Sequence, residues 1–276
     1  AMEATTTSSD SVAVGSNAMR VNTTGADNTA VGSAALESNT TGANNVALGR
    51  SALTANTTAS NNTAVGYQAL NASTTASENV AIGHQSMLST TTGGDNTALG
   101  QVSLKSNTTG VSNVAIGRKA LQDATTANQN TAVGTSAMEN VTTGSENTSV
   151  GFQSLDANTT GGSNVAVGHS AMSSNTTASE NTAVGKSALA STTTGSNNTA
   201  IGKGAMGANS TGSENVAVGQ DALDANTTGA SNTALGRASL SSNTTATGNT
   251  AVGESALRFS TTSPHNVAVG ASSLDA

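Results

Sequence analysis

Apolar and polar positions follow one 17-residue phrase along this chain, and the phrase recurs sixteen times without an insertion or deletion. Numbered from the asparagine that opens all but the first repeat, positions 2 to 5 are Thr or Val, usually Ala, an aliphatic residue, and Gly. Position 8 is Ala or Ser, position 9 is Leu or Met, and positions 13 and 14 are a Thr pair in almost every repeat. A short exact period with few helix formers is typical of a β-solenoid. The pattern predicts an all-β parallel β-solenoid, or β-roll, of sixteen coils, with residues 1–276 as a single repetitive segment.

A short strand is expected at positions 2 to 4, where residue types alternate with the period of two that marks a β-strand. We expect positions 4 and 9 to point into the core, with position 2 in a half-buried inward slot. A second short strand around Ala35 and Leu36 is expected to close the coil from the other side. In three successive repeats, the expected core residues are Val31, Leu48, Val65, Leu36, Leu53 and Leu70.

Three further columns are expected to be structural. The glycine after the strand marks a bend that needs positive φ or a close approach of two backbones. The asparagine before the strand is interpreted as a buried ladder of amides, with cavity or turn chemistry as alternatives. The Thr at position 14 is interpreted as a hydroxyl ladder, although a flat Thr array would also suit ice binding. Examples of the three columns are Gly32, Gly49, Gly66, Asn28, Asn45, Asn62, Thr24, Thr41 and Thr58.

The alanines at positions 3 and 8 are expected to face outward, and their small size predicts close packing against another chain. A turn too tight for larger side chains is the alternative. Three apolar side chains per coil make a thin core, so association of chains would add burial that a single chain lacks. We therefore expect a parallel homotrimer whose chain contacts include Ala30, Ala47, Ala64, Ala35, Ala52 and Ala69.

Composition excludes several classes of function. Charged residues make up 9% of the chain, the net charge is −7 and the aromatic residues are Tyr67, Phe152 and Phe259, so a nucleic-acid partner is not expected. The absence of cysteine excludes disulfides and thiolate metal sites. No apolar run is long enough for membrane insertion. Because the chain begins and ends inside the phrase, we expect it to be a segment of a longer array.

Side chains that could support catalysis or metal binding are dispersed over the repeats. The three histidines, His84, His169 and His265, lie several coils apart, whereas a catalytic triad needs side chains in direct contact. The acids at position 17, such as Asp27 and Glu78, are interrupted by neutral residues, so we expect a solvated column in preference to a calcium site. No enzymatic activity, cofactor or metal ion is expected.

The repeated phrase resembles those of known fibrous proteins in all sixteen repeats. The runs Asn79 to Gly83 and Asn113 to Gly117, both Asn-Val-Ala-Ile-Gly, resemble the head repeats of trimeric autotransporter adhesins. The phrase Asn-Thr-Ala-Val-Gly-Tyr-Gln-Ala-Leu at Asn62 to Leu70 looks like repeats of bacteriophage tail fibres and related bacterial surface fibres. The resemblance implies three parallel β-rolls packed about a common axis. It transfers no binding residue, because the binding surfaces vary among members of those families.

The expected function is that of a non-enzymatic structural or adhesive fibre segment, an elongated spacer or stalk of a phage tail fibre or bacterial surface adhesin. An ice-binding β-solenoid and a self-assembling extracellular filament subunit are the alternatives. The expected location is extracellular, at a cell surface or on a virion. The expected partner is the chain itself, and a host or cell-surface receptor would be bound by other parts of the parent chain.

Overall fold

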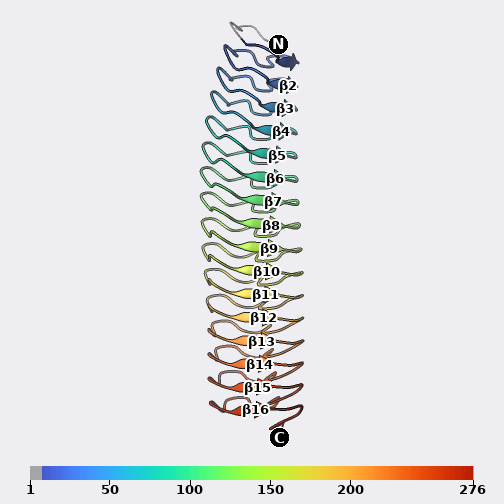
Figure 1. The fold of residues 1–276 in the computed structure, drawn as a ribbon, viewed down its shortest axis with the longest axis vertical. Helices are drawn as coiled ribbons and strands as arrows, with labels where there is room; N and C mark the ends of the chain where they lie inside the picture. Colours follow the sequence, from blue (N-terminus) through green and yellow to red (C-terminus); the bar gives the residue numbers. More distant parts are fainter. Residues whose placement is uncertain (1–7, 276) are drawn as a thin grey trace. The chain divides into compact units, whose positions relative to one another are not determined.

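The computed structural model describes residues 8–275 and divides the chain into two compact units, residues 1–143 and 144–276. Each unit is a stack in which one repeat makes one coil (Figure 1), and each coil contributes one strand of three residues. The described residues include no helix. The strands of the first unit are β1 (Val12–Val14), β2 (Thr29–Val31), β3 (Val46–Leu48), β4 (Thr63–Val65), β5 (Val80–Ile82), β6 (Thr97–Leu99), β7 (Val114–Ile116) and β8 (Thr131–Val133). Those of the second are β9 (Thr148–Val150), β10 (Val165–Val167), β11 (Thr182–Val184), β12 (Thr199–Ile201), β13 (Val216–Val218), β14 (Thr233–Leu235), β15 (Thr250–Val252) and β16 (Val267–Val269).

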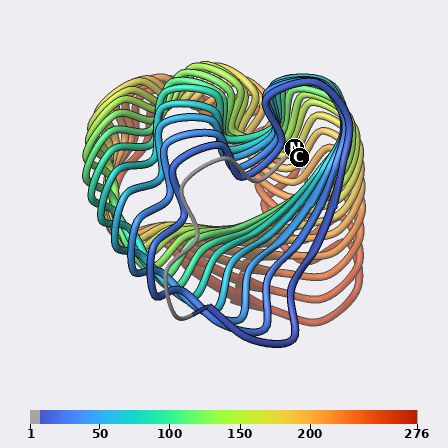
Figure 2. The same cartoon turned by 90° about the horizontal axis from the view of Figure 1, so that it is seen from above.

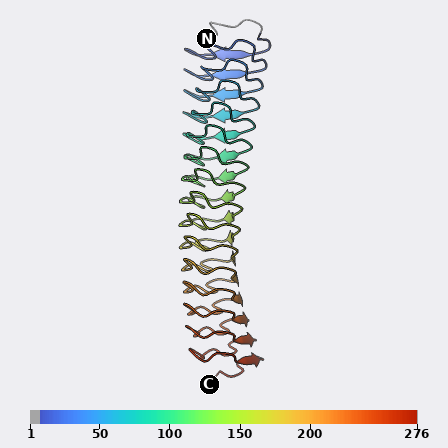
Figure 3. The same cartoon turned by 90° about the vertical axis from the view of Figure 1, so that its left-hand side faces the viewer.

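Within each unit, every strand pairs in parallel with the strand of the next coil. The register is one repeat, so Ala47 of β3 lies beside Ala64 of β4, and Ala200 of β12 lies beside Ala217 of β13. The strands of a unit therefore stack on one side of its coils (Figure 3), and the coils repeat one outline with a small rotation between neighbours (Figure 2). These findings confirm the predicted parallel β-solenoid with 17-residue coils.

The strand side chains point in the opposite direction from the prediction. From β2 to β15 the middle residue of the strand, as in Ala47 and Ala64, has no exposed surface. The residues on either side of it point outward and are half-buried or exposed in every strand. The prediction that positions 2 and 4 face the core is therefore wrong. This correction applies to Val31, Leu48 and Val65.

The narrow interior of the coil explains this inversion. Ser149 replaces the usual alanine at position 3, and its hydroxyl donates to the carbonyl oxygen of Ser154, at position 8, over 2.8 Å. Positions 3 and 8 thus face each other across the coil, where larger side chains would overpack the interior. Because their alanines are fully buried within one chain, the prediction that they make chain contacts is wrong. The alanines concerned are Ala30, Ala47, Ala64, Ala35, Ala52 and Ala69.

Position 9 supplies the large buried side chains, which include Leu36, Leu53 and Leu70. The predicted second strand does not form, because residues 33–38 are a turn in which Ala34 and Leu36 have φ values of 58° and 51°. This left-handed conformation directs alternate N–H groups to opposite neighbours. Ala34 donates to Ser16 in the coil before at 2.8 Å, and Leu36 donates to Ala52 in the coil after at 2.9 Å.

The asparagines before the strands form a buried ladder. The side-chain amide of Asn45 donates to Oδ1 of Asn28 at 3.1 Å, and the backbone N–H of Asn45 donates to the same oxygen at 2.9 Å. Asn62 makes the same two bonds to Asn45. The glycines after the strands all have positive φ, with values of 138°, 135° and 133° at Gly32, Gly49 and Gly66.

A second asparagine ladder, at position 12, is evident only in the structure. The amide of Asn39 donates to Oδ1 of Asn22 at 2.8 Å, and Asn56 donates to Asn39 over the same distance. The ladder stops wherever the next coil carries another residue, and Oδ1 of Asn56, followed by Ser73, has no hydrogen-bond partner. The other interruptions leave the same oxygen unpaired in Asn107, Asn175 and Asn243.

The two threonines of the pair have different roles. At position 13 the hydroxyl groups bond from coil to coil: Thr40 donates to the carbonyl oxygen of Thr57 at 3.0 Å. Thr24, Thr41 and Thr58, at position 14, have exposed side chains. The hydroxyl ladder therefore lies one position earlier than predicted.

Candidate interaction surfaces

Positions 2 and 4 of the strands form one surface in each unit, here called the outward sheet face. It carries no charged residue, because position 2 is Thr or Val and position 4 is Val, Ile or Leu. Its aliphatic side chains are substantially exposed, with 36% for Ile82 and 45% for Leu99 in the first unit and 41% for Ile201 in the second. Single exposed aliphatic residues are common, but a contiguous apolar strip marks an interaction surface.

Two exposed columns border the outward sheet face. The amino-side column is position 17, two residues before each strand, and the carboxyl-side column is position 6, two residues after it. The amino-side column contains no Lys or Arg and one histidine, His265. Its acids are Asp10, Asp27, Glu78, Asp95, Glu146, Glu180 and Glu214. The carboxyl-side column contains Arg50, Arg118, Lys186, Lys203 and Arg237, the histidines His84 and His169, and one acid, Glu254.

Aromatic rings in the carboxyl-side column stack along the coils. The ring centroids of Tyr67 and His84 lie 5.3 Å apart, and the guanidinium of Arg50 lies 5.9 Å from the Tyr67 centroid. In the second unit the rings of Phe152 and His169 are also 5.3 Å apart. Both faces of Tyr67 are covered by side chains of adjacent coils, so this ring presents only its edge to a ligand.

Charges in the turns are paired within one chain. Lys119 Nζ lies 2.7 Å from Glu139 Oε1, and Arg20 Nε lies 3.0 Å from Glu37 Oε1. Burial opposes ionisation of Glu139, but hydrogen bonds from Lys119 and Ser136 and the charges of Lys119 and Arg118 outweigh it and lower its pKa. These pairs join neighbouring coils and create no unpaired catalytic acid or base.

The candidate catalytic and metal-binding side chains do not converge. Among residues 8–275, no group of three His, Cys, Asp or Glu side chains is arranged to hold a metal ion. The Nδ1 atom of His169 lies 3.0 Å from the hydroxyl of Ser170, its neighbour in sequence, at the protein surface. No helix in this part of the chain is long and apolar enough to cross a membrane.

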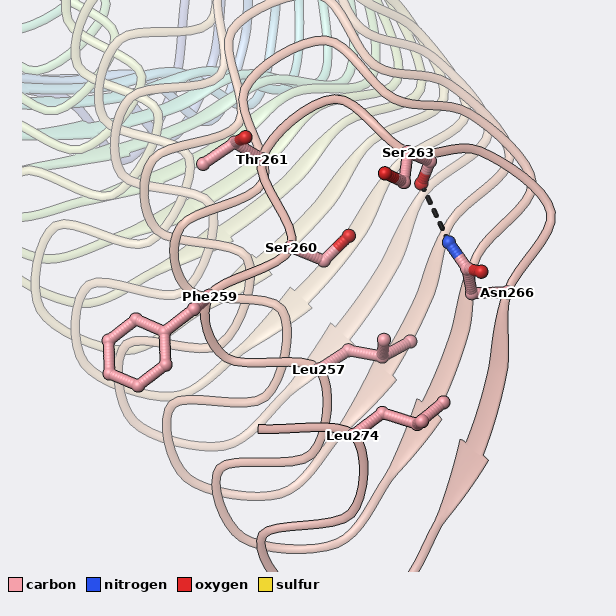
Figure 4. Close-up of a pocket in the computed structure, with 7 residues that line it drawn as sticks. All are labelled: Leu257, Phe259, Ser260, Thr261, Ser263, Asn266 and Leu274. Atoms are coloured by element: carbon pink, nitrogen blue, oxygen red, sulfur yellow. Dashed lines mark hydrogen bonds between the residues drawn. The ribbon is translucent and has the colours of Figure 1, made fainter. Parts of the chain in front are cut away.

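A pocket lies at the last described coil (Figure 4). It is lined by Leu257 and Leu274 of position 9, Ser260 of position 12 and Asn266 of position 1. The amide of Asn266 donates to the carbonyl oxygen of Ser263 at 2.9 Å, and the hydroxyl of Ser260 has no partner. In preceding coils these columns are buried under the next repeat. The pocket is therefore the uncovered interior of a coil, without a separate set of ligand-binding groups.

The chain matches no model of a known protein family and no curated protein. Its class follows from the fold alone: it is a tandem-repeat protein of the parallel β-solenoid type.

Proposed function

We propose that this chain is a non-enzymatic structural segment of an extracellular fibre, and that copies of it pack side by side through their outward sheet faces. The observation that carries the proposal is the aliphatic column at position 4, which stays partly exposed in every coil. Apolar surface left in water costs about 25 cal/mol per Å² relative to buried surface. A second sheet face that covers this column recovers that free energy at every coil.

A parallel homotrimer is the assembly we propose, with three outward sheet faces turned toward a common axis. The resemblance to trimeric adhesin heads and phage tail fibres supports this number of chains. The contacts are made by positions 2 and 4, in place of the alanine columns. The interior of one chain holds mainly small side chains and one Leu or Met per coil, so burial between chains adds stability that the interior does not provide.

The fibre segment acts as an elongated spacer at a cell surface or on a virion. A receptor pocket needs particular groups that converge at one place, whereas the exposed columns vary from coil to coil. Selective binding of a receptor is therefore assigned to other parts of the parent chain. Electron micrographs of the parent assembly would test this role directly: an extended shaft that separates a base from a terminal element supports it.

The self-association is tested by the triple substitution Val31→Thr, Ile82→Thr and Leu99→Thr. Threonine is β-branched and already occurs in these strands, so the fold is retained while apolar contact area is lost. Sedimentation velocity is expected to show the wild-type chain as a trimer and the variant shifted toward monomer, with an unchanged circular dichroism spectrum.

The matched control is Thr24→Ser, Thr41→Ser and Thr58→Ser, which changes three exposed side chains outside the sheet face. This control should sediment as the wild-type chain does. A wild-type chain that is monomeric at micromolar concentration would overturn the proposed assembly.

Ice binding is a second candidate, favoured by the direction of the strand side chains. Thr at position 2 of nine strands points outward, beside the outward position 4, and the Thr column at position 14 is exposed as well. Thermal hysteresis and ice shaping by the purified chain would establish this function. A self-assembling filament subunit would instead form long fibres without the parent chain.

A further inference from the structure

The two columns that border the outward sheet face carry opposite charge, and one chain does not pair them. Glu78 and Asp95 occupy successive coils of the amino-side column, and Lys186 and Lys203 occupy successive coils of the carboxyl-side column. Coils stack about 4.8 Å apart, so like charges are neighbours within each column. All these side chains are exposed. Among the described residues, these four side chains form no ion pair within one chain, whereas Arg237 of the carboxyl-side column is paired with Glu254 of the same column.

The spacing of the two columns in sequence suggests how they meet. Five acids of the amino-side column are followed 23 residues later by a basic residue of the carboxyl-side column: Asp27 and Arg50, Asp95 and Arg118, Glu146 and His169, Glu180 and Lys203, Glu214 and Arg237. This spacing is one repeat plus the six positions that separate the columns across a strand. At a spacing of six, only Glu180 and Lys186, and Glu78 and His84, are matched. No acid meets an acid at the spacing of 23.

We propose that neighbouring copies pack in parallel, so that each acid in the amino-side column of one chain meets the basic residue one coil further along in the carboxyl-side column of the next chain. The inference rests on the proposed self-association and specifies which charged columns meet and in what register. The outward sheet face provides the apolar surface that is buried between chains. The two charged columns determine the relative orientation of the chains. Each of the two units contains its own matched pairs, so the same contact is available to both.

The parallel direction follows from symmetry. When chains are related by rotation about an axis along the stack, the amino side of one sheet lies next to the carboxyl side of its neighbour. In an antiparallel pair with its sheets face to face, amino side meets amino side, and acids oppose acids. The charge pattern thus favours the parallel assembly and disfavours the antiparallel one.

A displacement of one coil is within the reach of these side chains. Within one chain, Arg20 and Glu37 are 17 residues apart and bond across adjacent coils at 3.0 Å. Lys119 and Glu139 are 20 residues apart and bond at 2.7 Å. The same side-chain types in the bordering columns can therefore bridge a one-coil step between chains.

Charge reversal tests the direction of packing. The acid-reversed variant is Asp27→Lys, Asp95→Lys and Glu180→Lys, and the base-reversed variant is Arg50→Glu, Arg118→Glu and Lys203→Glu. Each alone places like charges at three of the five matched pairs, so the concentration for half-dissociation should rise about tenfold or more at low salt. A chain with all six substitutions restores opposite charges and should associate as the wild-type chain does. Salt at about 1 M, where the Debye length is ~3 Å, should remove the differences.

The control for net charge is Asp123→Lys, Asp221→Lys and Asp224→Lys, which makes the same charge change in the turns at positions 7, 10 and 11, outside the two bordering columns and the ion pairs between coils. It should associate as the wild-type chain does. If the wild-type chain associates but the six-fold variant remains as weak as either triple variant, the parallel charge contact is wrong and the self-association stands. Triple variants that associate as the wild-type chain does would also overturn the parallel charge contact. A monomeric wild-type chain would overturn the proposed assembly and this inference together.

Discussion

At the scale of one residue, Gly66 shows why position 5 is glycine in every repeat. Its φ of 133° lies in a region that residues with a Cβ atom rarely adopt. A Cβ atom there would lie 2.5 Å from the carbonyl oxygen of Gly83 in the next coil. The close approach of the next backbone therefore requires glycine at this bend, and the same contact recurs from Gly83 to Gly100.

Gly66→Ala is expected to lower the free energy of unfolding by more than about 2 kcal/mol, because it adds backbone strain to a steric clash. The control is Gly94→Ala, at position 16, where other coils carry alanine at Ala26 and Ala43. A Cβ atom at Gly94 would lie 2.9 Å from the carbonyl oxygen of Ser77, but its φ is not positive, so a small backbone shift relieves the contact and the loss should stay well below that of Gly66→Ala. Urea unfolding followed by circular dichroism measures both, and equal losses would contradict the role assigned to the bend.

Asp224 is a residue whose charge opposes folding. Burial raises its pKa, and the nearby charge of Asp221 raises it further. A carboxyl with a raised folded-state pKa binds its proton more tightly in the folded chain than in the unfolded one. Its contribution to stability is therefore present at low pH and is lost as the pH rises through the folded-state pKa.

Asp224→Asn is accordingly expected to raise the melting temperature at neutral pH. It should make little difference below the ordinary aspartate pKa of about 3.9, where the carboxyl is protonated in both states. Melting curves at the two pH values measure the effect, and Glu78→Gln, which removes an exposed carboxylate outside the five matched pairs, is the control. A larger stabilisation at acidic than at neutral pH would contradict the sign.

At the scale of an element, the asparagine ladder at position 12 shows how one substitution interrupts a repeated bond. Asn175 and Asn209 stand one coil on either side of Thr192. The amide of Asn209 reaches the Thr192 hydroxyl at 3.4 Å, but Oδ1 of Asn175 is buried without a partner. An unpaired buried acceptor costs about 1–3 kcal/mol.

Thr192→Asn should close this gap, since the new side chain can donate to Asn175 and accept from Asn209. We expect a gain of about 1 kcal/mol in the free energy of unfolding. The reverse change, Asn226→Ser, breaks an intact run and should cost a similar amount or more. Ser174→Asn, at an exposed position of the same unit, serves as the control. Equal effects of Thr192→Asn and Ser174→Asn in urea unfolding would contradict the ladder argument.

The strand and its register could be predicted from sequence, because a translational repeat brings equivalent residues together in neighbouring coils. The direction of the side chains could not be deduced in this way. In Thr-Ala-Val either the middle residue or the two outer residues could face the core, and both sets contain an apolar residue. A signal was present in the coil of Ser149, where Ser154 accompanies it at the facing position. The left-handed turn at Ala34 and Leu36 has no such signal, because ordinary residues occupy both positions. The charged columns became a candidate surface only once the outward face was established.

At the scale of the whole molecule, the coil is the unit by which the protein can be lengthened or shortened. Each coil bonds to the coil before and the coil after through the same positions, as in other solenoid proteins. A deletion of complete repeats preserves every column, whereas a deletion of any other length places unlike positions in contact.

Deletion of residues 62–95, two complete repeats of the first unit, should leave the fold intact and shorten the chain by roughly 10 Å. It also removes Ser73 and Thr90, so Asn56 is followed directly by Asn107 and its Oδ1 gains a donor. Small-angle scattering measures the length and circular dichroism measures the fold. Deletion of residues 62–91 is out of phase and should unfold the neighbouring coils. If both deletions behaved alike, coil register would not control folding.

The buried ladder at position 12 has a consequence for the choice of expression host. Asn22, Asn39 and Asn56 are each followed by Thr-Thr, which matches the acceptor sequence for N-linked glycosylation. Their side chains have no exposed surface, and the Asn39 amide nitrogen that would carry the sugar bonds to Asn22 and to Gly42. A glycan attached there before folding would occupy the space of the adjoining coils. Expression in a secretory pathway that glycosylates nascent chains would therefore prevent these coils from stacking. A host without that modification would allow them to fold.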